Sequence, residues 1–100
     1  MEFMIVSTLK PSVSPAGMRE VLRVFSQWQP PTGGNLKFLY FATDSKTAFG
    51  LFETESAASL TEITSAFNDY LDFQVFPVME AQVGAEILGR MKAWVDQVKG

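Results

Sequence analysis

Few residues of this sequence could do chemistry on their own, because the chain contains no cysteine and no histidine. That composition excludes disulfides, thiolate nucleophiles, Ser-His-Asp triads, imidazole bases and zinc sites of the usual kind. Catalysis would have to use carboxylates, Tyr, Lys or Arg, or a borrowed cofactor. We expect neither a cofactor nor a metal site, and the remaining residue types leave open whether the protein is an enzyme.

Glu53 is the strongest candidate for acid–base chemistry. It has the same strand parity as Phe49 and Leu51, so the three side chains point to one side of a strand. A carboxylate beside two apolar side chains could act as a general acid or base. In the favoured alternative, Glu53 lies solvated at the end of the strand, or holds backbone amides of the following helix.

Four further side chains are candidates for binding a ligand: Trp28, Phe38, Tyr40 and Phe49. The Tyr40 hydroxyl could orient a ligand in a cavity, and Trp28, at the end of a helix, could line the mouth of that cavity. The more common roles are a core tyrosine whose hydroxyl reaches the surface, and a tryptophan that plugs a helix end. Phe38 shares the parity of Tyr40, and Phe49 shares that of Glu53.

Two other groups of residues give weaker signals. Gly33 and Gly34 follow no strand and open no helix, so they lack the context of a phosphate-binding loop and indicate a turn. Asp69, Asp72 and Glu80 could meet a divalent cation, but the spacing of an EF-hand is missing. Solvated surface charge is the favoured interpretation of these carboxylates.

The elements that must position these residues follow from apolar periodicity. Alternation of apolar residues predicts strands over residues 2–9, 35–43, 46–54 and 73–79. Recurrence at three- and four-residue spacing predicts helices over residues 14–28, from a serine cap at 56 or 59 to about 71, and over 83–98.

Local signals support the ends of these elements. Ser14 and Pro15 are typical of a helix N-cap followed by proline at the first helical position. Ser56 offers a cap for the second helix, and Ser59–Glu62 fits the capping-box pattern. Pro77 cannot donate to a strand ladder, which places the last strand at an edge of the sheet or marks a break at its end.

The order of elements predicts an α+β fold. The succession β-α-β-β-α-β with an added C-terminal helix is the ferredoxin-like arrangement, in which two helices cover one face of a four-stranded antiparallel sheet. One hundred residues are enough for one domain, so we expect residues 1–100 to form a single unit.

Each predicted strand has large apolar groups on both of its sides. In the second strand, for example, Leu36, Phe38 and Tyr40 share one parity, and Leu39 and Phe41 share the other. The sheet face that the two helices leave open would therefore be apolar, and its exposure would be costly. Either a second copy of the chain or the added C-terminal helix could cover this face. We expect a homodimer in which two sheets pair face to face across a two-fold axis.

Charge and hydropathy exclude other partners. The net charge is −3 and the eight Lys and Arg residues are scattered, so we expect no nucleic-acid partner. The longest apolar run, Phe38 to Ala42, is too short to span a membrane, and the N-terminal residues do not resemble a signal peptide. We therefore expect a soluble cytoplasmic protein without membrane partners.

Three segments give the chain a family resemblance: Phe25 with the loop 30–33, Phe49–Thr54, and Leu71–Val78. Over residues 2 to 90 the chain resembles the dimeric α/β-barrel proteins, and among these an uncharacterised domain-of-unknown-function family. The resemblance implies ferredoxin-like protomers whose sheets pair into a barrel. Relatives often have a Trp-His pair in the second strand, where Tyr40 and Phe41 stand here, so a histidine-dependent role does not transfer.

Three functions remain open from the sequence. The superfamily resemblance implies activities as different as cofactor-independent oxygenation, isomerisation, haem chemistry and ligand sensing, and the fold does not choose among them. We favour a domain that binds a small, largely apolar ligand or that serves as an oligomerisation module. The alternative is a cofactor-independent enzyme, monooxygenase-like or isomerase-like, with Glu53 as general base and Tyr40 positioning the substrate.

Overall fold

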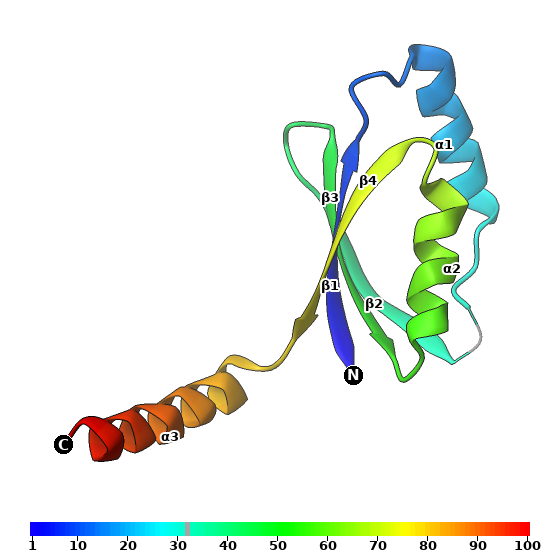
Figure 1. The fold of residues 1–100 in the computed structure, drawn as a ribbon. Helices are drawn as coiled ribbons and strands as arrows, with labels where there is room; N and C mark the ends of the chain where they lie inside the picture. Colours follow the sequence, from blue (N-terminus) through cyan, green and yellow to red (C-terminus); the bar gives the residue numbers. More distant parts are fainter. Residues whose placement is uncertain (32) are drawn as a thin grey trace.

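The computed structural model describes residues 1–31 and 33–100, so Thr32 of the loop 30–33 lies outside the described residues. The elements, in chain order, are β1 (Glu2–Leu9), α1 (Pro15–Gln27), β2 (Gly34–Phe41), β3 (Thr47–Thr54), α2 (Ala57–Phe67), β4 (Leu71–Val78) and α3 (Ala81–Lys99). The strands form one antiparallel sheet in the order β2-β3-β1-β4. Figure 1 shows α1 and α2 together on one side of this sheet. The predicted ferredoxin-like α+β fold with an added C-terminal helix is confirmed.

The start of α1 agrees with its sequence signals. Ser14 is the N-cap, its Oγ accepts a hydrogen bond from the backbone N–H of Gly17 at 3.1 Å, and Pro15 is the first helical residue. One backbone donor of the first turn is thereby satisfied by a side chain, while proline has no donor to satisfy.

The predicted capping box of α2 is wrong. The helix begins at Ala57 with Ser56 at the N-cap, and Ser59 is a buried residue inside its first turn. The helix also ends at Phe67, so Leu71 belongs to β4 rather than to the helical stripe. Helical spacing continued by chance through the connection to β4, and the pattern alone could not show where the backbone turned.

The core lies between the sheet and the two helices. Phe52 is fully buried and packs with Ile5 and Ile63, and partly buried side chains surround this cluster. Gly34 lies directly against the ring of Phe52, where a Cβ would clash with the ring. A glycine at the start of β2 therefore lets the sheet close over its largest buried side chain.

The strand register divides the sheet into two faces, which we call the helix face and the open face. Ile5 pairs with Gly50 and Val75, and Ser7 pairs with Ala48 and Phe73, so these side chains share the helix face. Their chain neighbours point to the open face. The small residues at 48 and 50 thus lie under the helices, as their size indicates.

An irregularity in β2 corrects one predicted face. The register shifts between Leu36, which pairs with Phe52, and Phe38, which pairs with Leu51. The extra residue, Lys37, reverses the alternation. Leu36 therefore lies on the helix face with Leu39, whereas Phe38 lies on the open face, and the prediction that Leu36 shares the face of Phe38 is wrong.

The C-terminal helix does not cover the open face of its own sheet. All of α3 is described and none of its residues is buried. Figure 1 shows it projecting from the end of β4, away from the sheet and on the side opposite to α1 and α2. Of the two covers considered for the open face, the C-terminal helix of the same chain is therefore not in place.

Candidate functional site

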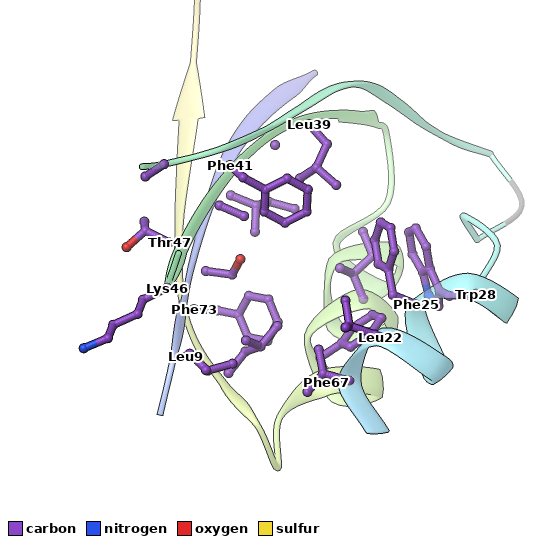
Figure 2. Close-up of a pocket in the computed structure, with 18 of the residues that line it drawn as sticks. Leu9, Leu22, Phe25, Trp28, Leu39, Phe41, Lys46, Thr47, Phe67 and Phe73 are labelled. Atoms are coloured by element: carbon purple, nitrogen blue, oxygen red, sulfur yellow. The ribbon is translucent and has the colours of Figure 1, made fainter. Parts of the chain in front are cut away.

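A cavity of about 390 Å³ separates the helix face of the sheet from α1 and α2. Its walls come from all four strands, from both helices and from the turn between β2 and β3 (Figure 2). The volume lies within the range of about 300–1,000 Å³ that is usual for small-molecule sites. The lining residues are Ile5, Ser7, Leu9, Met18, Val21, Leu22, Phe25, Trp28, Leu36, Leu39, Phe41, Ala42, Ser45, Lys46, Thr47, Ala48, Gly50, Phe52, Ile63, Phe67, Leu71 and Phe73.

Three aromatic rings form the wall that the helices contribute. Phe25 stacks on Trp28 with ring centroids 6.3 Å apart, and Phe67 of α2 meets Trp28 edge-on at 6.1 Å. Phe67 is also 6.2 Å from Phe25. The three rings contact one another, so this wall presents aromatic faces and edges to the cavity.

The apolar side chains at one end of the cavity are open to solvent. Phe41 at the end of β2 is 73% exposed and Leu22 of α1 is 60% exposed, and both line the cavity. Figure 2 shows these two side chains on opposite walls, one on the sheet and one on the helix. We call Leu22 and Phe41 the rim of the cavity.

Polar groups are few in the lining. Ser7, Ser45, Lys46 and Thr47 are the polar residues among it, and Figure 2 shows the Lys46 amine pointing away from the cavity. Ser7 lies on the helix face between Ala48 and Phe73, so its hydroxyl is surrounded by apolar walls. Such a site suits a molecule that is apolar over most of its surface.

The structure separates the residues predicted from sequence into two groups. Trp28 lines the cavity. Glu53, Tyr40, Phe38 and Phe49 lie on the open face, as their pairing registers require. The sheet therefore stands between Trp28 and the other four candidates, and Glu53 and Tyr40 do not meet in the cavity.

Glu53 belongs to a small charged cluster at one end of the open face. Lys37 Nζ lies 3.3 Å from Glu53 Oε2 and 3.1 Å from Glu2 Oε2. Hydrogen bonds to Glu2 and then to Glu53 raise the pKa of Lys37, against a smaller opposing effect of desolvation. The Glu53 side chain is 47% exposed. Its carboxylate thus has an ion-pair partner that sequence spacing did not reveal, because the irregularity at Lys37 turns this side chain to the open face.

The centre of the open face is an apolar band with polar residues on both sides. The residues of the band follow from the pairing registers: Met4, Val6, Phe38, Tyr40, Phe49, Leu51 and Phe76. The Phe38 and Tyr40 rings are 5.1 Å apart, and Tyr40 is 67% exposed. Beyond the band lie the Lys37 cluster at one end and Thr8, Thr47 and Asp72 at the other.

None of the residues with the weaker sequence signals lines the cavity. Gly33 has a φ of 84° and lies in the loop before β2, as predicted for a turn. Within the described residues no group of three or more acidic side chains is arranged to hold a metal ion. Among the described helices, none is both long and apolar enough to cross a membrane.

The cavity itself could not be predicted by choosing chemically active residue types, because its walls are mostly aliphatic and aromatic. One signal was available in the sequence. Ala48 and Gly50 mark the strand parity that lies beneath helices, which places Phe49 and Glu53 on the opposite side. The apolar residues on the side of the sheet away from the helices then predict a separate apolar surface. They do not belong to the walls of the cavity.

A family model described as a domain of unknown function, DUF3303, matches residues 1–92. No curated protein matches the sequence.

Proposed function

Because the chain belongs to the DUF3303 family, whose description assigns no activity, we propose a function from the geometry: the domain binds a small, largely apolar molecule in the cavity between its sheet and its helices. The observation that supports this proposal most directly is the cavity of about 390 Å³ between these layers. Water in such a space would find few polar partners on the walls, whereas an apolar molecule would gain contacts with them.

The shape of the walls narrows the class of ligand. The stacked Phe25 and Trp28 rings favour a flat or aromatic group against them. The Ser7 hydroxyl offers one hydrogen bond within the lining. A molecule with one ring system and a single hydroxyl or carbonyl group would satisfy both features.

A filled-cavity variant tests the proposal. Ala48→Leu adds three carbon atoms to the cavity lining, so binding of an uncharged apolar fluorescent probe such as N-phenyl-1-naphthylamine should weaken by about tenfold or more. The titration uses Trp28 fluorescence quenching in a Trp94→Phe background, since the sequence has two tryptophans. The quenching then reports on binding beside Trp28, and the Ala48→Leu variant separates binding in the cavity from binding in the second pocket, which Trp28 lines with Arg23, Val24 and Gln27.

Thr8→Leu is the matched control. Thr8 is exposed and lies on the open face of β1, one pairing step from Ala48, since Ser7 pairs with Ala48 and Thr8 with Thr47. It should leave the probe affinity unchanged. Equal loss of binding in the two variants, or quenching of Trp28 that persists with the cavity filled, would contradict the proposal.

A separate observation supports self-association through the open face. An apolar band with polar residues on both sides has the composition of a protein interface, an apolar centre within a polar rim. We therefore propose a homodimer in which two open faces pack together across a two-fold axis. This pairing would remove from water the apolar surface that α3 leaves uncovered.

Substitution in the band tests the dimer. Phe49→Lys places a charge at the centre of the band, so the variant should sediment as a monomer at micromolar concentrations at which the wild-type chain sediments as a dimer. Ser65→Lys introduces the same charge at an exposed residue of α2, on the other side of the sheet, and should remain dimeric. A wild-type chain that is monomeric at these concentrations rules out the pairing.

The enzyme alternative has less support from this geometry. A general base must reach the proton that it removes, directly or through one water molecule. Glu53 lies across the sheet from the cavity and is paired with Lys37. Binding is the function that the arrangement of the cavity supports best.

A further inference from the structure

The α3 helix has an apolar surface without a partner in its own chain. Along one side of the helix lie Val83, Ile87, Met91, Trp94 and Val98, at helical spacing. Met91 is 49% exposed and Trp94 is 56% exposed. Most of the stability of a helix in a protein comes from packing of its apolar side, so a covering surface is to be expected.

The rim of the cavity also lacks a cover, and α3 of the same chain does not lie over it (Figure 1). Val78, at the end of β4, pairs with Glu2, whereas the turn next to Phe41 lies beyond the pair of Thr8 and Thr47. Six residues of strand, about 20 Å, separate these two ends of the sheet. Only Met79 and Glu80 connect β4 to α3, and Figure 1 shows the helix leading away from the sheet.

We infer that α3 of a second copy of this chain closes the rim of the cavity, so that each binding site is completed by its partner's C-terminal helix. This inference rests on the proposed pairing of open faces. The end of β4 and the turn between β2 and β3 lie at opposite corners of the sheet. When two open faces pack about a two-fold axis along the diagonal that joins the other two corners, with their strands crossing at nearly a right angle, the end of β4 in one copy comes next to that turn in the other. The two-fold axis then makes the exchange reciprocal.

The length of α3 fits this placement. Paired sheets lie about 10 Å apart, and the layer that contains Leu22 lies roughly 10 Å beyond the partner's sheet. Helix α3 rises about 1.5 Å per residue, so Met91 and Trp94 lie about 15 and 20 Å from its start at Ala81. These are the residues that would arrive at the rim.

The buried area also fits a dimer. Tyr40, Phe49, Phe76 and Trp94 are each exposed by between 39% and 67%, and at about 150–250 Å² per aromatic side chain these four leave roughly 400 Å² to cover. The aliphatic residues of α3 and the rim add to this area. The sum approaches the 800 Å² or so per partner that is usual for a stable interface.

Cross-linking tests the placement directly, because the sequence contains no cysteine. In the double variant Phe41→Cys, Met91→Cys, a short bis-maleimide should give covalent dimers whose peptide map shows a link between positions 41 and 91. The control is Phe41→Cys, Ala93→Cys. Ala93 is two residues from Met91 and therefore on the other side of the helix, so its yield should be several-fold lower.

A binding measurement gives an independent readout. Trp94→Asp should lower the affinity for the apolar probe by about tenfold, while sedimentation still shows a dimer held by the open faces. A dimer that gives no 41–91 link, equal yields in the two double variants, or only links within one chain overturns the placement of α3 and leaves the pairing intact. A monomeric wild-type chain overturns both the pairing of open faces and the placement of α3. A wild-type chain that does not bind the probe overturns the cavity proposal alone.

Discussion

At the scale of single residues, close packing decides which small side chains matter. Gly34 and Gly50 both lie in strands, but a Cβ at Gly34 would clash with the Phe52 ring, whereas a Cβ at Gly50 would make ordinary contacts with Leu36 and Leu39. Phe52 is fully buried, so its ring cannot move aside without cost to the core.

The two glycines therefore make a matched pair for a stability prediction. Gly34→Ala should lower the free energy of unfolding by about 1–3 kcal/mol, the usual cost of overpacking a core. Gly50→Ala should leave it within about 0.5 kcal/mol of the wild type, since the added methyl group fits beside two leucines. Urea denaturation of both variants measures the difference, and equal effects would show that the Phe52 ring has room to shift.

The same scale shows what residue type can and cannot reveal. Trp28 was identified from its place at a helix end, and the structure puts it in the cavity wall. Glu53 and Tyr40 are candidates from sequence because they are polar among apolar neighbours, and both lie on the open face. Parity shows that two side chains share a face, but it does not show which face the helices cover.

At the scale of elements, the hairpin between β2 and β3 depends on one carboxylate. Asp44 Oδ1 accepts the backbone N–H groups of Lys46 at 2.8 Å and of Thr47 at 3.0 Å, and its Oδ2 accepts the Thr47 hydroxyl at 2.9 Å. These hydrogen bonds hold the pKa of Asp44 below its ordinary value of 3.8, and the bond from the Lys46 backbone N–H has the largest effect. The turn next to the cavity rim is thus held in place by a charged acceptor.

This arrangement predicts a pH dependence of stability. The pKa of Asp44 is lower in the folded than in the unfolded chain, so its contribution is complete above the unfolded value and is lost as the pH falls through the folded value, below about pH 4. Asp44→Asn should therefore reduce the loss of stability measured by urea denaturation between about pH 5 and pH 2. Asp69→Asn, at an exposed aspartate, should leave that loss unchanged, and identical profiles for the two variants would contradict the assignment.

The ends of the helices and strands are the features that sequence periodicity predicts least well. The strand β1 and the cap of α1 were predicted correctly, because alternation and the Ser14-Pro15 signal agree there. The end of α2 was placed too late, because Tyr70 and Leu71 continue the helical spacing by coincidence. The irregularity at Lys37 left no signal in the sequence, since both neighbouring residues are apolar and fit either face.

At the scale of the whole molecule, the structure is elongated, with principal extents of 61 × 30 × 19 Å, because α3 extends beyond the sheet and helices. The ferredoxin-like order was predictable from the succession of patterns alone, and the apolar character of both sheet faces was predictable from strand parity. The direction of α3 was not. The apolar pattern of α3 is equally compatible with packing on its own sheet and with packing on a second copy of the chain. Only the path of the two-residue connection after Val78 distinguishes these two placements.

The two edges of the sheet have a further consequence, for aggregation. An exposed edge strand offers unpaired backbone groups to which a strand of another molecule can add. The β4 edge contains Pro77, which has no N–H to offer. The β2 edge contains Lys37 beside a break in register, and a charge and a bulge both discourage strand addition. Each margin of the sheet thus has a feature that disfavours sideways growth into fibrils, although the open face between the margins is apolar.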